Sequence, residues 1–153
     1  SDTFHGRYIY AFTGARLATG FVAYEEVGRK LDLEEISRLN TGEVKIENGN
    51  TIQGTIDILD VRFGNLWTNI PKEDFENLGI KYGDTVELTI NHDSRKVYSS
   101  TVKYVKSFSE VNTGATLLYV NSLHKIGVAI NQGSFSKAHQ VDSGYQWKVE
   151  FKK

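Results

Sequence analysis

The sequence has no cysteine, no methionine and a single proline among its 153 residues. Without cysteine the chain can form neither disulfides nor thiolate metal sites, which is compatible with a cytoplasmic protein. The four histidines are scattered and form neither an HxxxH nor an HxH pair, so we expect no metal site. No apolar run approaches the roughly 20 residues of a membrane-spanning helix, and we therefore expect no membrane partner.

An excess of charge of either sign is also missing. The chain carries 18 Lys plus Arg against 19 Asp plus Glu, a net charge of −1. A surface that follows phosphates needs a positive excess, so we expect no nucleic-acid partner. The sequence also has no Walker loop, no GxGxxG motif and no GxSxG elbow, which excludes the commonest nucleotide-binding and hydrolase motifs.

The pattern from residue 43 onward is mostly β. Two alternating runs meet at Asn48-Gly49, a strong hairpin signal, and five more short alternating runs follow, separated by turn residues. One helix interrupts them at "IPKEDFENLG", where Pro71 stands near the first turn and Gly79 at the end. We predict a mainly β fold, a small barrel or sandwich over residues 43–153.

The first 42 residues have a different character. Apolar residues between positions 7 and 19 fit a helix that Gly20 ends, and residues 25–36 are typical of a short, irregular helical connector. Because position 1 is not methionine, we expect a segment upstream. We interpret residues 1–42 as the truncated helical end of an N-terminal α/β domain, and residues 43–153 as a C-terminal β-barrel domain.

The segment "DVRFGNLWTNI" (60–70) is unusual for a strand. Asn65 and Asn69 are poor strand formers, and Gly64 weakens a strand unless the backbone bends or approaches another group closely. Three further stretches are "TFHGR" (3–7), "YVNS" (119–122) and "AINQGS" (129–134), each of which alone is ordinary helix-end or turn chemistry. We predict that 60–70 binds a ligand.

In order and spacing, these stretches resemble the S-adenosylmethionine hydroxide adenosyltransferase family, which is related to the fluorinases and chlorinases. The most specific parts are the Phe-Gly-Asn and Thr-Asn pattern of residues 63–69 and the Tyr-x-Asn-Ser stretch. Family members are nearly twice as long, with an α/β half upstream of a C-terminal barrel. The resemblance implies a homotrimer in which each site lies between one subunit's N-terminal domain and the next subunit's barrel.

The resemblance implies that residues 60–70 line the S-adenosylmethionine site. Asp60 would face the amino group of the methionine moiety, and Asn65 would recognise the adenine edge. Phe63 and Trp67 would form apolar walls.

Other segments would complete the site. Phe108 would pack against adenine, Ser122 would contact the methionine carboxylate, and Asn131 and Gln132 would close over the adenine. The implied substrate-binding set is Phe4, Asp60, Phe63, Asn65, Trp67, Phe108, Ser122, Asn131 and Gln132.

The implied reaction is displacement of methionine from ribose C5′ by water, giving adenosine, with S-adenosylmethionine as substrate and no cofactor. His5, Gly6 and Arg7 would be the catalytic stretch, with His5 orienting and activating the water. Gly6 stands where halogenating relatives carry a serine that helps hold fluoride. Leu123 and Ile130 stand where those relatives tend to carry arginines, so the methionine and adenine contacts there differ.

Three other interpretations stay open. The first is a chlorinase-like, S-adenosylmethionine-dependent halogenase, because Gly6 leaves room for chloride. The second is a non-catalytic adenosine-binding or oligomerisation module. The third is an oligonucleotide-binding barrel that uses Phe63, Trp67 and Tyr98 as stacking platforms, which the balanced charge disfavours.

Overall fold

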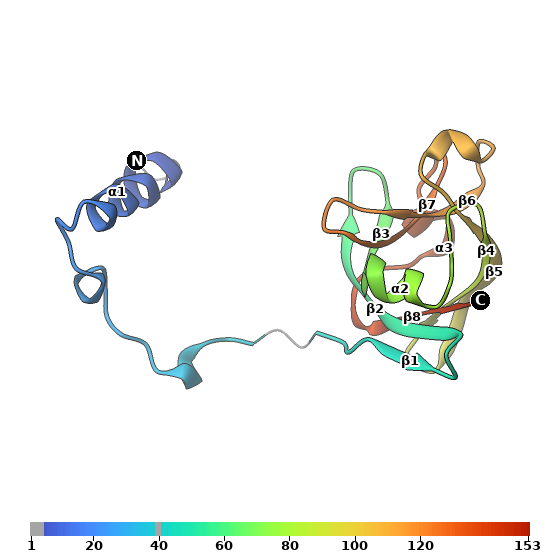
Figure 1. Cartoon of the computed structure of the whole chain (residues 1–153), viewed down its shortest axis with the longest axis horizontal. Coiled ribbons are helices and arrows are strands. Elements are labelled where there is room, and N and C mark those ends of the chain that lie inside the picture. Colours follow the sequence, from blue (N-terminus) through green and yellow to red (C-terminus); the bar gives the residue numbers. More distant parts are fainter. Residues whose placement is uncertain (1–4, 39–40) are drawn as a thin grey trace. The chain divides into compact units, whose positions relative to one another are not determined.

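The computed structural model describes residues 5–38 and 41–153. The chain divides into two compact units, Ser1–Leu39 and Asn40–Lys153 (Figure 1). Each unit is described by itself.

The first unit is helical. A π-helical turn, η1 (Gly6–Ala11), runs into α1 (Phe12–Ala18), and the helix ends at Thr19, followed by Gly20 in the left-handed region with φ +69°. The predicted helix over 7–19 is confirmed, and its π-helical start was not predicted. Two 3₁₀ turns follow, η2 (Tyr24–Glu26) and η3 (Leu33–Glu35). None of these four elements contains a buried residue.

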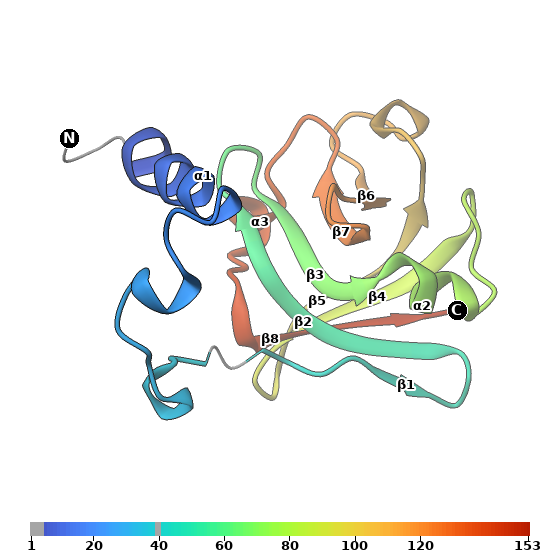
Figure 2. The same cartoon turned by 60° about the vertical axis from the view of Figure 1, so that its left-hand side comes forward.

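The second unit is a closed β-barrel (Figures 1 and 2). Seven strands close it in the order β2-β3-β7-β6-β5-β4-β8 and back to β2, and β1 adds to the free edge of β2. All pairings are antiparallel except that of β5 with β6. The mainly β prediction is confirmed. The strands are β1 (Lys45–Glu47), β2 (Thr51–Asp60), β3 (Asn65–Pro71), β4 (Thr85–His92), β5 (Arg95–Tyr104), β6 (Thr116–Val120), β7 (Lys125–Ile130) and β8 (Gly144–Lys152).

Local signals explain where these elements turn. The β1–β2 hairpin turns at Asn48-Gly49, both with positive φ, as the sequence predicted. The predicted helix after β3 is α2 (Lys72–Asn77), which Pro71 precedes and Gly79, at φ +78°, follows. A 3₁₀ turn, η4 (Phe108–Glu110), lies between β5 and β6, and α3 (Phe135–His139) lies between β7 and β8.

The barrel interior holds one large hydrophobic core. Phe75 from α2 contacts Tyr104 and Phe151 edge-on, with ring centroids 5.1 and 5.3 Å apart. All three side chains are fully buried. Because the core fills the barrel, side chains that bind a ligand have to come from the outer face or from the loops.

Candidate functional site

The outer face of strands β2, β3, β7 and β6, together with the loops next to it, carries most of the predicted ligand-binding residues. On these strands Leu66 pairs with Val128, and Val128 pairs with Leu118, and all three side chains belong to the core. Successive side chains on a strand point to opposite faces. Asn65 and Trp67, which flank Leu66, therefore point outward, away from the core.

A cavity of about 670 Å³ opens on this outer face. It brings together six of the residues predicted from the sequence, although they span more than seventy positions. It also includes Arg62, Tyr119, Ile130, Gly133 and Ser134, of which only Ile130 was discussed individually from the sequence. The predicted residues in its wall are Asp60, Phe63, Asn65, Phe108, Asn131 and Gln132.

The β2–β3 loop forms one side of the cavity. The Asp60 carbonyl accepts hydrogen bonds from the amides of Phe63 (3.2 Å) and Gly64 (2.6 Å), and its carboxylate accepts one from the amide of Arg62 (3.2 Å). Gly64 has φ +71°, and a side chain there would collide with Ser134. The backbone at Gly64 does approach another group closely, while its place beside a ligand stays a prediction. What approaches Gly64 is α3's N-terminal cap, Ser134.

Among the described residues, the cavity wall holds two charged side chains, Arg62 and Asp60, and Asp60 is the less exposed of the two. Its carboxylate is largely shielded, whereas the neighbouring Arg62 guanidinium is 80% exposed and lies 3.9 Å from it. An ion pair at that distance with one exposed partner is weak. The cavity thus presents a carboxylate to a cationic ligand group without a strong competing partner.

The opposite side of the cavity is built by η4 and the end of β7. Ser107 and Glu110 form a capping box around Phe108, in which the Glu110 carboxylate accepts from the Ser107 amide at 2.8 Å. The Asn131 side-chain amide donates to the Val111 carbonyl at 2.9 Å and so ties this loop to β7. The Asn131 amide nitrogen therefore holds the loop that carries Phe108, whereas the sequence predicted that this side chain contacts adenine.

Trp67 lies next to the cavity. Its indole N–H donates to the hydroxyl of Tyr119 at 2.9 Å, and the Tyr119 ring contacts Phe108 edge-on at 5.2 Å. Burial raises the pKa of the Tyr119 hydroxyl above its usual value, and the negative charge of Asp60 adds to this. Hydrogen bonds with Trp67 and Asn65 act in the opposite direction. The hydroxyl is therefore protonated at neutral pH.

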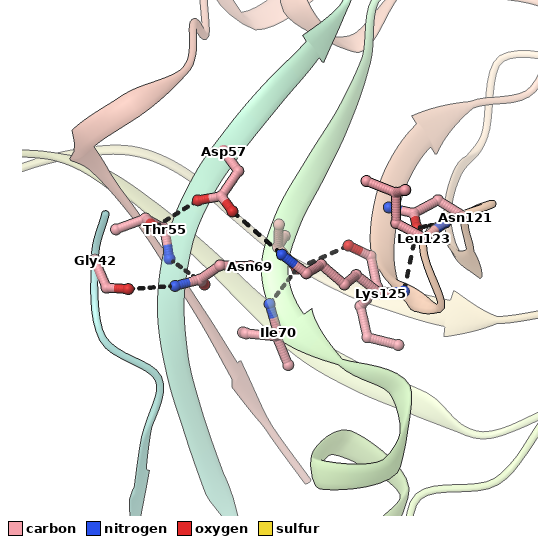
Figure 3. Close-up of polar contacts among 10 residues, drawn as sticks. Gly42, Thr55, Asp57, Asn69, Ile70, Asn121, Leu123 and Lys125 are labelled. Atoms are coloured by element: carbon pink, nitrogen blue, oxygen red, sulfur yellow. Dashed lines mark hydrogen bonds and ion pairs between the residues drawn. The ribbon is translucent and has the colours of Figure 1, made fainter. Parts of the chain in front are cut away.

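Ser122 does not line this cavity. It lies in the turn between β6 and β7, at the other end of that hairpin from Ile130, and it is exposed. Asn121 holds the turn through its side-chain oxygen, which accepts from the amides of Leu123 (2.9 Å) and Lys125 (3.1 Å), as Figure 3 shows. The Asn121 side-chain nitrogen is buried and has no hydrogen-bond partner among the described residues.

Asn69, the second asparagine of the 60–70 segment, has a structural role. Its side chain accepts from the Thr55 amide at 2.8 Å and donates to the Gly42 carbonyl at 2.7 Å (Figure 3). It thereby fixes the chain at the start of the barrel unit to β2. Beside it, Lys125 lies 3.4 Å from the Asp57 carboxylate.

The predicted catalytic stretch lies in the first unit. His5 is exposed and precedes η1, and its side chain makes no capping hydrogen bond. At Gly6, an added side chain would meet no atom within 4 Å. The Arg7 guanidinium lies over the Tyr8 ring, 5.4 Å from its centroid. Phe4 lies outside the described residues.

Neither a metal site nor a membrane helix emerges from the part of the chain that the structure describes. No group of three or more His, Asp or Glu side chains in residues 5–38 and 41–153 is arranged to hold a metal ion. No helix in those ranges is long and apolar enough to cross a membrane.

Comparison with known proteins identifies the family to which this chain belongs. Residues 54–148, which include every residue of the cavity wall, match the model of the SAM hydroxide adenosyltransferase C-terminal domain, where SAM is S-adenosylmethionine. The chain belongs to the SAM hydroxide adenosyltransferase family. The resemblance found in the sequence is thereby confirmed.

Named relatives of this chain include two kinds of enzyme. A fluorinase of Actinoplanes sp. (strain N902-109) is 32% identical over 143 residues, which are 93% of this chain and 46% of the relative. An (R)-S-adenosyl-L-methionine hydrolase of Methanocaldococcus jannaschii is 31% identical over 142 residues, again 93% of this chain and 46% of the relative.

Solved structures agree with the fold. An uncharacterized conserved protein from Thermotoga maritima superposes with a TM-score of 0.73 and 30% identity, covering all of this chain and 54% of that one. The chain spans about half the length of the curated relatives it matches.

Proposed function

We propose that this chain is part of an enzyme that cleaves S-adenosylmethionine at ribose C5′ with water, giving adenosine and L-methionine. The barrel would contribute the adenine and methionine side of the site. Family membership supports an enzyme that acts on S-adenosylmethionine. The observation that carries the proposal is the convergence of Asp60, Asn65, Phe108 and Asn131 on one cavity.

The chemistry of the cavity suits this ligand. Phe63 and Phe108 provide apolar and aromatic surface for a purine, and Asn65 offers a side-chain donor and acceptor. Asp60 offers a carboxylate to the ammonium group of the methionine moiety. The cavity's one other charged residue among those described, Arg62, is exposed to solvent.

The reaction needs little from the protein beyond alignment. The water oxygen forms a bond to C5′ while the C5′–S bond breaks. The electron pair of the broken bond goes to sulfur, so methionine leaves as a neutral thioether. No general acid is required, because the sulfonium already carries the positive charge. Alignment and exclusion of bulk water therefore supply most of the rate. We assign His5 to orient the attacking water and to accept its proton.

A second copy of the longer protein would complete the site. Three of the large apolar residues that the barrel exposes lie on the β2–β3 hairpin beside the cavity: Ile58, Val61 and Phe63. Such a cluster is typical of a surface that another protein surface covers. We propose, as the family resemblance implies, a homotrimer with sites at subunit interfaces, and we propose that it acts in the cytoplasm.

The test is product analysis with the longer protein that carries this chain, incubated with S-adenosylmethionine in high chloride. We expect adenosine and methionine, a loss of roughly 100-fold or more in kcat in the His5→Ala variant, and little change in a His124→Asn control in the exposed β6–β7 turn. The 153-residue chain alone should give no turnover.

A chlorinase-like halogenase is the second candidate, favoured by one observation. Gly6 has no side chain, which leaves room for an anion larger than fluoride and offers it no side-chain donor. If the main product is 5′-chloro-5′-deoxyadenosine and His5→Ala has no effect, the water-using proposal is wrong. Binding of adenosine without turnover of the longer protein would instead support the non-catalytic module.

A further inference from the structure

Arg62 is a charged residue of the cavity wall that the proposed function leaves without a role. It lies in the β2–β3 loop, two positions after Asp60, and its backbone amide donates to the Asp60 carboxylate at 3.2 Å. Its guanidinium Nε lies 3.9 Å from the same carboxylate oxygen. The loop therefore places a carboxylate and a guanidinium side by side in the wall of one cavity.

Two neighbours hold the guanidinium only loosely. Its central carbon lies over the Phe63 ring, 5.5 Å from the ring centroid. The 3.9 Å separation from the Asp60 oxygen is too long for a hydrogen bond, and most of the Arg62 side chain is exposed. Arg62 can therefore direct its planar fork of N–H donors toward a ligand, and the geometry of that fork matches a carboxylate.

The β6–β7 turn, where the family resemblance puts the carboxylate contact, is a poorer partner for an anion. Ser122 is uncharged and lies outside the cavity. The next residue, Leu123, is apolar. Lys125, which follows the turn, already lies 3.4 Å from the Asp57 carboxylate. Within the part of the chain that the structure describes, Arg62 is the one cation of the cavity wall.

An α-amino acid carries both of its charged groups on one carbon, with the ammonium nitrogen about 2.5 Å from the carboxyl carbon. A ligand whose ammonium group contacts Asp60 therefore brings its carboxylate within reach of Arg62. We propose that Arg62 is a specificity-determining residue that binds the α-carboxylate of the methionine moiety, beside the ammonium group at Asp60. The proposal rests on the proposed function, because it takes the ligand to be S-adenosylmethionine. It moves the carboxylate contact from Ser122 to the β2–β3 loop.

The test compares two substrates of the longer protein that carries this chain. One is S-adenosylmethionine. The other is S-adenosyl-3-(methylthio)propylamine, which keeps the sulfonium and the ammonium group but lacks the carboxylate. The release of the thioether product is measured, because it reports cleavage of the C5′–S bond whichever nucleophile attacks. The wild type should prefer S-adenosylmethionine at least roughly tenfold in kcat/KM, the equivalent of one hydrogen bond to a charged group.

The variants identify which side chain gives this preference. Arg62→Gln should reduce the preference about tenfold, mainly by raising the KM for S-adenosylmethionine, because the carboxylate is bound alike in the substrate and the transition state. Arg62→Lys, which keeps the charge without the fork, should show an intermediate preference. Asp60→Asn should weaken both substrates alike, since both carry the ammonium group. Arg95→Gln, at the exposed start of β5, is the matched control and should change neither substrate.

The outcomes separate this proposal from the proposed function. If Arg62→Gln keeps the wild-type preference and Ser122→Ala removes it, the role of Arg62 is refuted and the carboxylate contact belongs to Ser122. Equal losses for both substrates in Arg62→Gln also refute it, since they indicate only a loosened loop.

The wild type supplies the remaining outcomes. Equal cleavage of the two substrates refutes carboxylate recognition by Arg62 and leaves the proposed function standing. If cleavage of S-adenosylmethionine yields no adenosine, the proposed function is wrong, while the substrate comparison still decides the role of Arg62. If neither substrate is cleaved, both proposals are wrong.

Discussion

The two compact units differ in how far they bury their large apolar side chains. In the barrel, Phe75, Tyr104 and Phe151 are fully buried and contact one another. In the first unit, Phe12 is 57% exposed and Tyr24 is 80% exposed. The barrel therefore closes its own core and can hold a cavity wall in place. The apolar side chains of the first unit are instead available to a surface outside that unit.

The largest expected effect is on the barrel core. Phe151→Ala should lower the free energy of unfolding by about 3–5 kcal/mol, because it leaves a cavity among buried aromatic rings. Phe12→Ala in the first unit should change it by less than about 0.5 kcal/mol. Urea unfolding followed by the fluorescence of Trp67 and Trp147, which both lie in barrel strands, measures both. Equal losses in the two variants would contradict the contrast between the units.

A smaller effect is expected where the barrel unit begins. Asn69→Ala leaves the Thr55 amide and the Gly42 carbonyl without their partner, which should cost about 1–3 kcal/mol. The Thr55 amide should also lose protection from hydrogen exchange. Asn77→Ala, at an exposed position of α2, is the control and should change neither quantity. Unchanged Thr55 protection in Asn69→Ala would argue against this role.

Removing the first unit should have little effect on the barrel. A chain of residues 40–153 should unfold within roughly 2 °C of the Tm of the whole chain, because the barrel core is made only of barrel residues. Differential scanning calorimetry of the two chains makes the comparison. A drop of ten degrees or more would show that the barrel depends on the first unit.

The smallest effect concerns the ion pair of the first unit. The Arg29 guanidinium, 2.8 Å away, lowers the pKa of the exposed Glu35 carboxyl, and the Asp32 amide adds to this. Stability from a lowered carboxyl pKa is present above the unfolded value of about 4.3 and is lost as pH falls through the folded value. NMR titration of Glu35 should show the lowered pKa in wild type and its usual value in Arg29→Gln. An identical pKa in both would rule out the pair in solution.

The sequence predicted the fold best where a local signal sets the backbone. Asn48-Gly49 placed the first hairpin, and Pro71 and Gly79 placed α2, because each residue limits its own φ. The π-helical start of the first helix was missed, because it depends on a shift in hydrogen bonding that no residue type marks.

The site was predicted in part. Asp60, Phe63 and Asn65 lie within one short loop and strand start, so their proximity follows from the sequence. Tyr119 was missed although its stretch was noted, because its contact with Trp67 depends on the pairing of β6, β7 and β3. The same pairing puts Ser122 at the far end of its hairpin from Ile130. Strand register is a long-range property, and a short motif does not contain it.

The closure of the barrel by its last strand has a consequence for biosynthesis. β8 pairs with both β2 and β4, and Gln53 on β2 bonds to Glu150, ninety-seven positions later. Closing so long a loop is slow, since its entropy is lost before the contacts form. On the ribosome, the edges of β2 and β4 stay open until β8 has emerged. A nascent chain that stalls before β8 therefore presents two unpaired strand edges, to which chaperones or other nascent chains can bind.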